Sequence, residues 1–285
     1  METVGVNVTH DASFCRCVNG EIDMFLEEER LSRKKHDNMP VKTVMELQES
    51  NFAGVTGLEY HDYSLRDTCN FFDVIFRKKI PDHDYRTYNQ HHYLHACCGF
   101  YNSGFEEADV VVVDGLGNFF DEENHECATR WHIKKPAEIK LLERQGASRF
   151  GIKTDRHGYW PMGVGMAYAS ISDYLGFGQL GSGKVMGLAP YGKEDPNIKP
   201  FVIDGRVNSK LFYRTKYSAN FIPYDYLPEE VNIKDQRFMN LAYRLQKDFE
   251  KWMTDFILKC EFKNIVLTGG CALNCVANYE YLKHL

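Results

Sequence analysis

The residues best suited to chemistry lie between positions 90 and 118. His91 and His95 are four residues apart in a stretch without Gly or Pro that is typical of a helix, so both imidazoles lean toward one face. Residues 110–113 are four valines typical of a buried strand, which ends at Asp114 and two nearby glycines. Two neutral imidazoles and one carboxylate suit a metal ion with open positions. We therefore predict that His91, His95 and Asp114 bind a metal.

The plainer interpretation of this histidine pair is coincidence. On spacing alone, two histidines four apart are more often a surface or core accident than a ligand pair. His92 is also three residues before His95 and could compete for the same face. The metal hypothesis therefore depends on the motifs that accompany it.

Length and composition set bounds on the class of protein. The 285 residues can bury one large or two modest cores, and 44% hydrophobic with 26% charged residues is ordinary globular composition. The net charge of −6 and the pI near 6.0 argue against a protein that holds extended nucleic acid mainly through phosphates. A single nucleotide needs only a few cations and stays open as a ligand.

Targeting and redox signals are weak. The N-terminus has no basic segment followed by an apolar core, and no apolar run reaches the roughly eighteen residues of a membrane span. Nine cysteines form no pair of CxxC motifs, so we expect reduced thiols and not a zinc or disulfide framework. We expect a cytoplasmic protein without a signal peptide or membrane segment.

The first elements are predicted to be strands. Residues 4–8 form one strand, and residues 14–18 and 22–26 form a hairpin because Asn19-Gly20 joins them. The polar loop at residues 9–13 is consistent with turn chemistry, but it can equally hold phosphate or carbonyl oxygens. On composition alone, residues 27–36 are a solvated, self-paired face that changes from acidic to basic. A helical pattern follows at 41–50.

The later chain alternates helices, glycine-rich turns and strands. Residues 176–183 are a glycine-rich turn that leads into Lys184 and Gly187. It is not a Walker P-loop, because Val185 follows Gly183-Lys184, but such glycines let backbone approach a phosphate closely. The other predicted segments are strands at 128–133, 139–142 and 264–268, helices at 163–176 and 240–256, a surface excursion at 195–235, and a helix that begins after Gly269-Gly270.

Six motifs occur in one order: residues 10–13, 27–36, 91–96, 112–117, 184–192 and 269–278. Together they resemble the NodU/CmcH-type O-carbamoyltransferases, whose members include the tobramycin carbamoyltransferase. Each motif alone is weak, and six in sequence are highly specific. The resemblance covers nearly the whole chain except residues 51–88 and 195–235.

The resemblance implies an α/β fold of the actin-like ATPase (ASKHA, Kae1-like) class, with two similar RNase H-like halves. We expect the first Kae1-like half at 1–158, with the metal-binding residues, and the second at 159–285, with the nucleotide site. The alternation of strands and helices agrees loosely with this expectation.

The resemblance also implies a reaction. Carbamoyl phosphate and ATP give carbamoyl adenylate, and the carbamoyl group then passes to a hydroxyl of a small-molecule acceptor such as a sugar, antibiotic or hydroxymethylated nucleotide. In such relatives the Kae1-like part performs the transfer, while a C-terminal YrdC-like domain makes the adenylate.

Site residues follow from the matching positions. His91, His95 and Asp114 would hold iron(II), with manganese and zinc as other possible metals. His10 is the expected base for the acceptor hydroxyl, with Asp11 as a second catalytic residue. The residues implied to bind ATP or carbamoyl adenylate are Gly115, Gly117, Lys184, Gly187, Gly270 and Asn274. Those implied to bind the anionic donor are Arg33, Lys35 and His36.

Two departures from the family pattern affect this prediction. The family's fourth metal ligand is an Asp beyond the Gly269-to-Asn278 motif, and this sequence stops at Leu285. A YrdC-like domain is also absent. We therefore expect a truncated second half that binds metal poorly alone and needs a YrdC-like partner or missing domain. A homodimer is a possible assembly.

Other functions stay open. A Kae1-like component of tRNA threonylcarbamoyladenosine synthesis would share the histidine pair, but the acidic balance disfavours tRNA. An actin-like kinase or ATPase would leave His91 and His95 idle, and a non-haem iron oxygenase lacks sequence support for its β-helix. A non-catalytic subunit that needs a second polypeptide is the remaining alternative.

Overall fold

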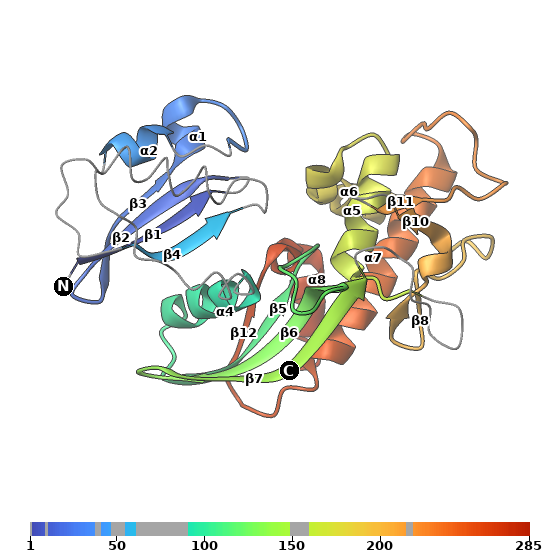
Figure 1. Cartoon of the computed structure of the whole chain (residues 1–285). Coiled ribbons are helices and arrows are strands. Elements are labelled where there is room, and N and C mark those ends of the chain that lie inside the picture. Colours follow the sequence, from blue (N-terminus) through green and yellow to red (C-terminus); the bar gives the residue numbers. More distant parts are fainter. Residues whose placement is uncertain are drawn as a thin grey trace. The chain divides into compact units, whose positions relative to one another are not determined.

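The structure is a computed structural model, and it describes residues 2–8, 11–37, 41–46, 55–60, 91–148, 160–214 and 219–285. Contacts within the chain divide it into two units, Met1–Thr87 and Tyr88–Leu285, which are described separately below. Figure 1 shows strands and helices in both units, as expected for an α/β protein.

The first unit contains a four-stranded sheet in the order β3-β2-β1-β4. Its strands are β1 (Glu2–Val8), β2 (Ser13–Val18), β3 (Glu21–Glu27) and β4 (Val55–Tyr60). The predicted hairpin between β2 and β3 is confirmed, because the turn residues Asn19 and Gly20 both have positive φ, 52° and 91°. β4 runs parallel to β1, whereas β2 is antiparallel to it.

Two short helices, α1 (Glu28–Ser32) and α2 (Val41–Glu46), follow the hairpin. The Glu28 side chain is buried, and its carboxylate accepts hydrogen bonds from the backbone N–H groups of Lys42 and Thr43 at 3.0 and 2.8 Å. A carboxylate in this position satisfies the free N–H groups at the start of α2. At least one member of the predicted acidic cluster is therefore an internal helix cap and not a solvated residue.

The second unit contains another four-stranded sheet, in the order β12-β5-β6-β7 (Figure 1). Its strands are β5 (Glu107–Val113), β6 (Asn124–Lys134), β7 (Glu138–Ser148) and β12 (Ile265–Thr268). The valines of β5 are fully buried in the centre of this sheet. Helix α4 (His91–Asn102) packs against it through Ala96 and Phe100.

The two sheets share one topology. In each, the first and second strands and the second and third strands are antiparallel, and the fourth strand lies parallel to the first on its other side. The contact division at residues 87 and 88 differs from the predicted boundary near residue 158, which is outside the described residues. A boundary at 158 would separate β12 from β5. The assignment of two Kae1-like halves stays a prediction.

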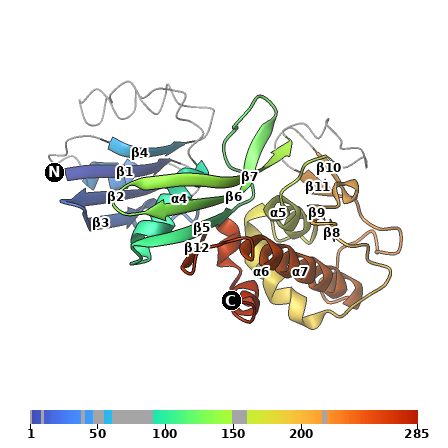
Figure 2. The ribbon, with the colours of Figure 1, turned by 90° about the horizontal axis from the view of Figure 1, so that it is seen from below.

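The rest of the second unit packs around one long helix, α7 (Gln236–Ile257), which Asp235 caps by accepting the Arg237 N–H at 2.9 Å. Helix α6 lies beside α7 (Figure 2). The remaining elements are α5 (Val164–Tyr174), η2 (Gln179–Gly181), α6 (Ser182–Leu188), η3 (Ala189–Tyr191), β8 (Val202–Ile203), β9 (Arg206–Val207), η4 (Ser209–Leu211), β10 (Phe212–Arg214), β11 (Ala219–Phe221), η5 (Gly270–Leu273) and α8 (Cys275–Tyr281).

The prediction of a surface excursion at 195–235 is wrong. Phe201, Phe212 and Phe221 come from this segment, are buried, and have ring centroids 6.0 to 6.3 Å apart within the main core. Strands of two or three residues are too short to show a periodic pattern, so the sequence did not reveal these strands. Within the described residues, no helix has the length and apolar character needed to cross a membrane.

Candidate metal centre

The start of α4 and the end of β5 bring three predicted ligands together. His91 Nε2 lies 2.9 Å from Asp114 Oδ2, and His95 Nε2 lies 3.3 Å from the same oxygen. The two imidazole rings are 4.6 Å apart between centroids and nearly perpendicular. One donor atom from each of the three residues lies within 4.8 Å of the other two. The predicted convergence of two imidazoles and one carboxylate is thus present.

Backbone contacts hold these residues in place. The backbone N–H of His91, which has no acceptor within the first turn of its helix, donates to Asn118 Oδ1 at 2.9 Å. Asp114 continues the pairing of β5, since its N–H donates to the Cys127 carbonyl at 3.1 Å. Its Oδ1 accepts the Gly115 N–H at 2.7 Å, which leaves Oδ2 for the histidines. The loop after β5 therefore positions both sides of the site.

Three glycines pack closely against the end of β5. A Cβ at Gly270 would be 2.8 Å from Asp114 Oδ1, and a Cβ at Gly165 would be 2.6 Å from the Asp114 carbonyl oxygen. Gly269 has a φ of +87°, and a Cβ there would be 2.5 Å from the Val113 carbonyl oxygen. A side chain at any of these positions would force a neighbouring atom to shift. The predicted glycine motif after β12 therefore lies directly against the carboxylate of the site.

The electrostatics of the site favour a cation. Burial alone would raise the pKa of Asp114, but hydrogen bonds from His91 and His95 outweigh this effect and hold the pKa well below its usual range. Asp114 is therefore a carboxylate at neutral pH. An ionised carboxylate with two imidazole nitrogens is a donor set that divalent transition metals accept, so the residues present fit the metal that the sequence predicts.

His92 does not compete for this face. Its side chain is fully buried, and Nδ1 lies 3.0 Å from Thr129 Oγ1, on the β6 side of α4. Burial is the main reason that the pKa of His92 falls to about 3, so its imidazole is neutral. His92 serves the packing of α4 on the sheet.

The glycines predicted to bind a nucleotide differ in their surroundings. Added Cβ atoms at Gly115 and Gly187 would meet nothing within 4 Å, so there is free space for a ligand beside the backbone at both positions. Gly117 is enclosed instead, because a Cβ there would be 2.7 Å from the His92 ring and 3.0 Å from Glu126. Lys184 is exposed on α6. The nucleotide-binding role of these residues stays a prediction.

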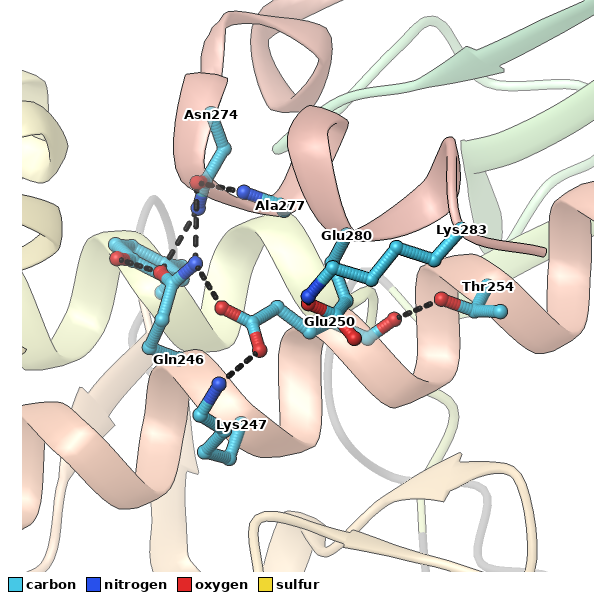
Figure 3. Close-up of polar contacts among 9 residues, drawn as sticks. Gln246, Lys247, Glu250, Thr254, Asn274, Ala277, Glu280 and Lys283 are labelled. Atoms are coloured by element: carbon cyan, nitrogen blue, oxygen red, sulfur yellow. Dashed lines mark hydrogen bonds and ion pairs between the residues drawn. The ribbon is translucent and has the colours of Figure 1, made fainter. Parts of the chain in front are cut away.

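Asn274, another predicted nucleotide ligand, takes part in a buried amide network (Figure 3). Its Oδ1 caps α8 by accepting the Ala277 N–H at 3.1 Å, and it also accepts from Gln246 Nε2 at 3.1 Å. Its Nδ2 donates to Gln246 Oε1 at 2.9 Å, and the same oxygen accepts from the Tyr168 hydroxyl. Through these contacts the Asn274 side chain fixes the segment after Gly270 to helix α7.

The predicted residues of the first unit form a group of their own. Asp11 Oδ1 lies 2.7 Å from His36 Nδ1, and the His36 N–H donates to Glu29 Oε2 at 3.1 Å. Arg33 and Lys35 are exposed beside this group in the sequence. His10, the predicted base, is outside the described residues.

Sequence reasoning missed Asn118 and Gln246. Asn118 follows the glycine motif directly, and the need of a helix start for hydrogen-bond acceptors is the signal that could have identified it. Gln246 lies among the buried apolar residues of α7, where a polar residue requires a partner.

Comparison with known proteins identifies the family. The family model for the carbamoyltransferase N-terminus matches residues 55–284, and the chain belongs to this family. The resemblance to NodU-type carbamoyltransferases that the motifs predict is thereby confirmed at the level of the family.

Two curated relatives match 96% of the chain. One is an uncharacterized protein, sll1178, of Synechocystis sp., which is 23% identical over 341 aligned residues that make up 51% of its length. The other is the nodulation protein NolNO of Sinorhizobium fredii, 24% identical over 310 residues and 42% of its length. The chain thus spans about half the length of the curated relatives it matches. Among solved structures, an Aquifex aeolicus member of the Ppx/GppA family is 11% identical over 100% of this chain and 98% of that chain, with a TM-score of 0.33.

Proposed function

We propose that this chain is the transferase part of a metal-dependent O-carbamoyltransferase, which moves a carbamoyl group from carbamoyl adenylate to a hydroxyl of a small molecule. The observation that carries this proposal is the convergence of His91, His95 and Asp114 in a chain that belongs to the carbamoyltransferase N-terminus family. The fold we propose is the actin-like ATPase fold, with one RNase H-like half built on each of the two sheets of shared topology.

The metal centre is proposed to hold iron(II), manganese or zinc through His91 Nε2, His95 Nε2 and Asp114 Oδ2. A divalent metal there would supply Lewis acidity to the carbamoyl carbonyl, where negative charge develops during transfer. The contacts of Asn118 and Gly270 would keep the ligands in position, since partners behind metal ligands commonly set metal affinity.

The transfer step needs a base and a leaving group. As the acceptor oxygen bonds to the carbamoyl carbon, the bond from that carbon to the adenylate phosphate breaks, and AMP leaves with the electron pair. The hydroxyl proton passes to an imidazole, which we propose to be His10, with Asp11 as the second catalytic residue. A neutral imidazole suits this role near pH 7.

Cationic side chains and glycines with accessible backbone are proposed to bind the donor. We propose that Arg33, Lys35 and His36 bind the anionic part of the donor, and that Lys184 lies at the phosphate of the adenylate. Gly115 and Gly187, which have free space where a Cβ would be, would let backbone approach the nucleotide closely. Asn274 would act by holding the glycine turn and not by direct contact, because its amide is already paired.

A transfer assay tests the proposal. The chain is loaded with iron(II) or Mn²⁺ and combined with a YrdC-like protein, ATP and carbamoyl phosphate, and hydroxyl-bearing acceptors are screened by mass spectrometry. A carbamoylated product that requires the metal and disappears in His95→Ala is the expected result. Adenylate formation by the YrdC-like protein without transfer to any acceptor, in the presence of bound metal, would reject the proposed function.

A further inference from the structure

A completely buried carboxylate lies beside the start of helix α4. The side chain of Glu126, on β6, has 0% exposure, and the Nε of Arg144, on β7, lies 3.0 Å from its Oε1. The Arg144 guanidinium lies over the Phe120 ring, with Cζ 5.2 Å from the ring centroid. Acidic side chains are rarely buried to this extent, because removing a charge from water costs free energy that other interactions must offset.

The carboxylate of Glu126 acts on the first turn of α4. Burial raises the pKa of Glu126, while Arg144 and the backbone N–H of His92 oppose this effect. The first turn of α4 contains no acidic residue of its own, and the free N–H groups at the start of a helix favour a negative charge nearby. Glu126 provides this charge from the adjacent strand.

The backbone of Glu126 fixes the loop on the other side of the metal centre. The Gly117 N–H donates to the Glu126 carbonyl at 2.7 Å, and the Glu126 N–H donates to the Asn118 carbonyl at 3.0 Å. The side chain of Asn118 in turn accepts the His91 N–H. Glu126 therefore contacts the loop that follows Asp114 as well as the helix that carries His91.

The tautomer of His92 places a hydrogen in the same region. Trp131 Nε1 donates to Thr129 Oγ1 at 2.7 Å, so the hydroxyl proton of Thr129 is available for His92 Nδ1, 3.0 Å away. A neutral imidazole that accepts at Nδ1 carries its proton on Nε2. Within the described part of the chain this buried Nε2 has no hydrogen-bond partner, and an added Cβ at Gly117 would be 3.0 Å from both Nε2 and Glu126 Cβ. The charge of Glu126 compensates this buried N–H group.

We propose that Glu126 is a positioning residue of the metal centre. Its negative charge holds the start of α4, sets the position of His91 and so raises the affinity for a divalent cation. Glu126 is not one of the three converging donors, so it acts through the ligands and not as one of them. This inference rests on the proposed metal centre. Groups behind metal ligands typically change metal affinity by about ten- to a hundredfold.

Two substitutions in the ion pair separate the charge of Glu126 from its packing. Glu126→Gln keeps the shape and removes the charge, so the Mn²⁺ affinity should fall at least about tenfold and the electron paramagnetic resonance spectrum of bound Mn²⁺ should change. Arg144→Gln breaks the same ion pair but keeps the negative charge. Its Mn²⁺ affinity should equal or exceed that of the parent.

Glu28→Gln is the matched control. Glu28 is also buried, at 1% exposure, and caps α2 in the first unit by accepting the Lys42 N–H at 3.0 Å. This variant should keep the affinity and the spectrum of the parent. Amide hydrogen exchange without metal provides a second readout, because exchange at His91 and His92 should be faster in Glu126→Gln and unchanged in Glu28→Gln.

The outcomes separate this role from the metal centre itself. Parent binding that Glu126→Gln does not weaken would reject the role of Glu126 alone, as would an equal loss of affinity in Arg144→Gln or Glu28→Gln, because the loss would then reflect general destabilisation. Unchanged amide exchange at His91 and His92 in Glu126→Gln would also reject it. Absence of Mn²⁺ binding in the parent would reject the metal centre and, with it, the role of Glu126.

Discussion

Gly270 lies so close to Asp114 that an added Cβ would be 2.8 Å from Oδ1 of the aspartate. Replacing Gly270 with alanine should therefore displace the carboxylate from the position in which Oδ2 faces His91 and His95. Because groups that orient metal ligands typically change metal affinity by about ten- to a hundredfold, we expect a loss in this range for Gly270→Ala. Calorimetric titration with Mn²⁺ measures it.

Gly183→Ala is the matched control for that substitution. A Cβ at Gly183 would meet nothing within 4 Å, and the residue lies on α6, outside the three-ligand group. Its metal affinity should equal that of the parent. Equal affinity in Gly270→Ala and the parent would show that the glycine turn does not position Asp114.

Gly187→Ala separates a structural from a ligand-binding role of the glycine-rich helix α6. Alanine is favoured over glycine inside a helix by about 0.5–1 kcal/mol, and there is free space at this position, so the stability of the protein should rise slightly. If backbone at Gly187 approaches a nucleotide, the added methyl group should weaken ATP binding several-fold. Thermal unfolding and fluorescence titration with an ATP analogue check both effects, and unchanged ATP affinity would remove Gly187 from the nucleotide site.

Gln246→Leu should destabilise the protein through the amide pair with Asn274. The leucine would leave the amide oxygen and the amide nitrogen of Asn274, and the Tyr168 hydroxyl, each with one partner fewer in a buried environment. Unsatisfied buried polar groups cost about 1–3 kcal/mol each, so we expect a loss near 2–3 kcal/mol in the free energy of unfolding. Urea denaturation measures this quantity.

The comparison variant for Gln246→Leu is Thr254→Val on the same helix. The Thr254 hydroxyl bonds only to the Glu250 carbonyl among the contacts drawn in Figure 3, and its loss does not reach Asn274. We expect a change of about 1 kcal/mol or less. A Gln246→Leu variant no less stable than Thr254→Val would show that the network contributes little.

The residues that the sequence predicts best are those with local signals. The Asn19-Gly20 hairpin, the valines of β5 and the helix around His91 and His95 are all present, because turn chemistry and apolar runs are properties of neighbouring residues. The convergence of Asp114 with the histidines was also predictable, since a polar residue directly after a buried strand lies at the edge of the sheet.

What the sequence could not reveal depends on contacts between distant segments. The parallel pairing of β12 with β5 joins residues more than 150 positions apart, and no local pattern specifies it. The same is true of the pair formed by Gln246 and Asn274, in which Asn274 also caps α8, while its predicted role as a nucleotide ligand stays a prediction. The strands β10 and β11 were missed because each is only three residues long.

His132 should make stability depend on pH. Its Nδ1 lies 2.8 Å from Asp109 Oδ1 and its Nε2 lies 3.1 Å from Glu107 Oε1. The hydrogen bond to Asp109 is the main cause that raises the pKa of His132 above its usual value. Asp109 also accepts the N–H groups of Glu261 and Phe262, so this ion cluster holds the loop that precedes β12.

The sign of the effect follows from the raised pKa. The protonated imidazole stabilises the folded state fully below the unfolded pKa of about 6.5, and this contribution is lost as the pH rises through the higher folded pKa. The melting temperature should therefore fall as the pH rises above about 6.5. His132→Gln should show a smaller fall over the same interval, and an identical pH profile in both proteins would exclude His132 as the source.

The central claim is that His91, His95 and Asp114 together bind one divalent ion. Its most direct test is titration of the chain with Mn²⁺. Binding is monitored as the decrease in the electron paramagnetic resonance signal of free Mn²⁺. We predict weak binding that saturates at one Mn²⁺ per chain, with affinity lower by at least about tenfold in His95→Ala and in Asp114→Asn, and no such loss in Gly183→Ala. Binding of equal strength in the parent and both ligand variants, or no binding in any of them, would contradict the account.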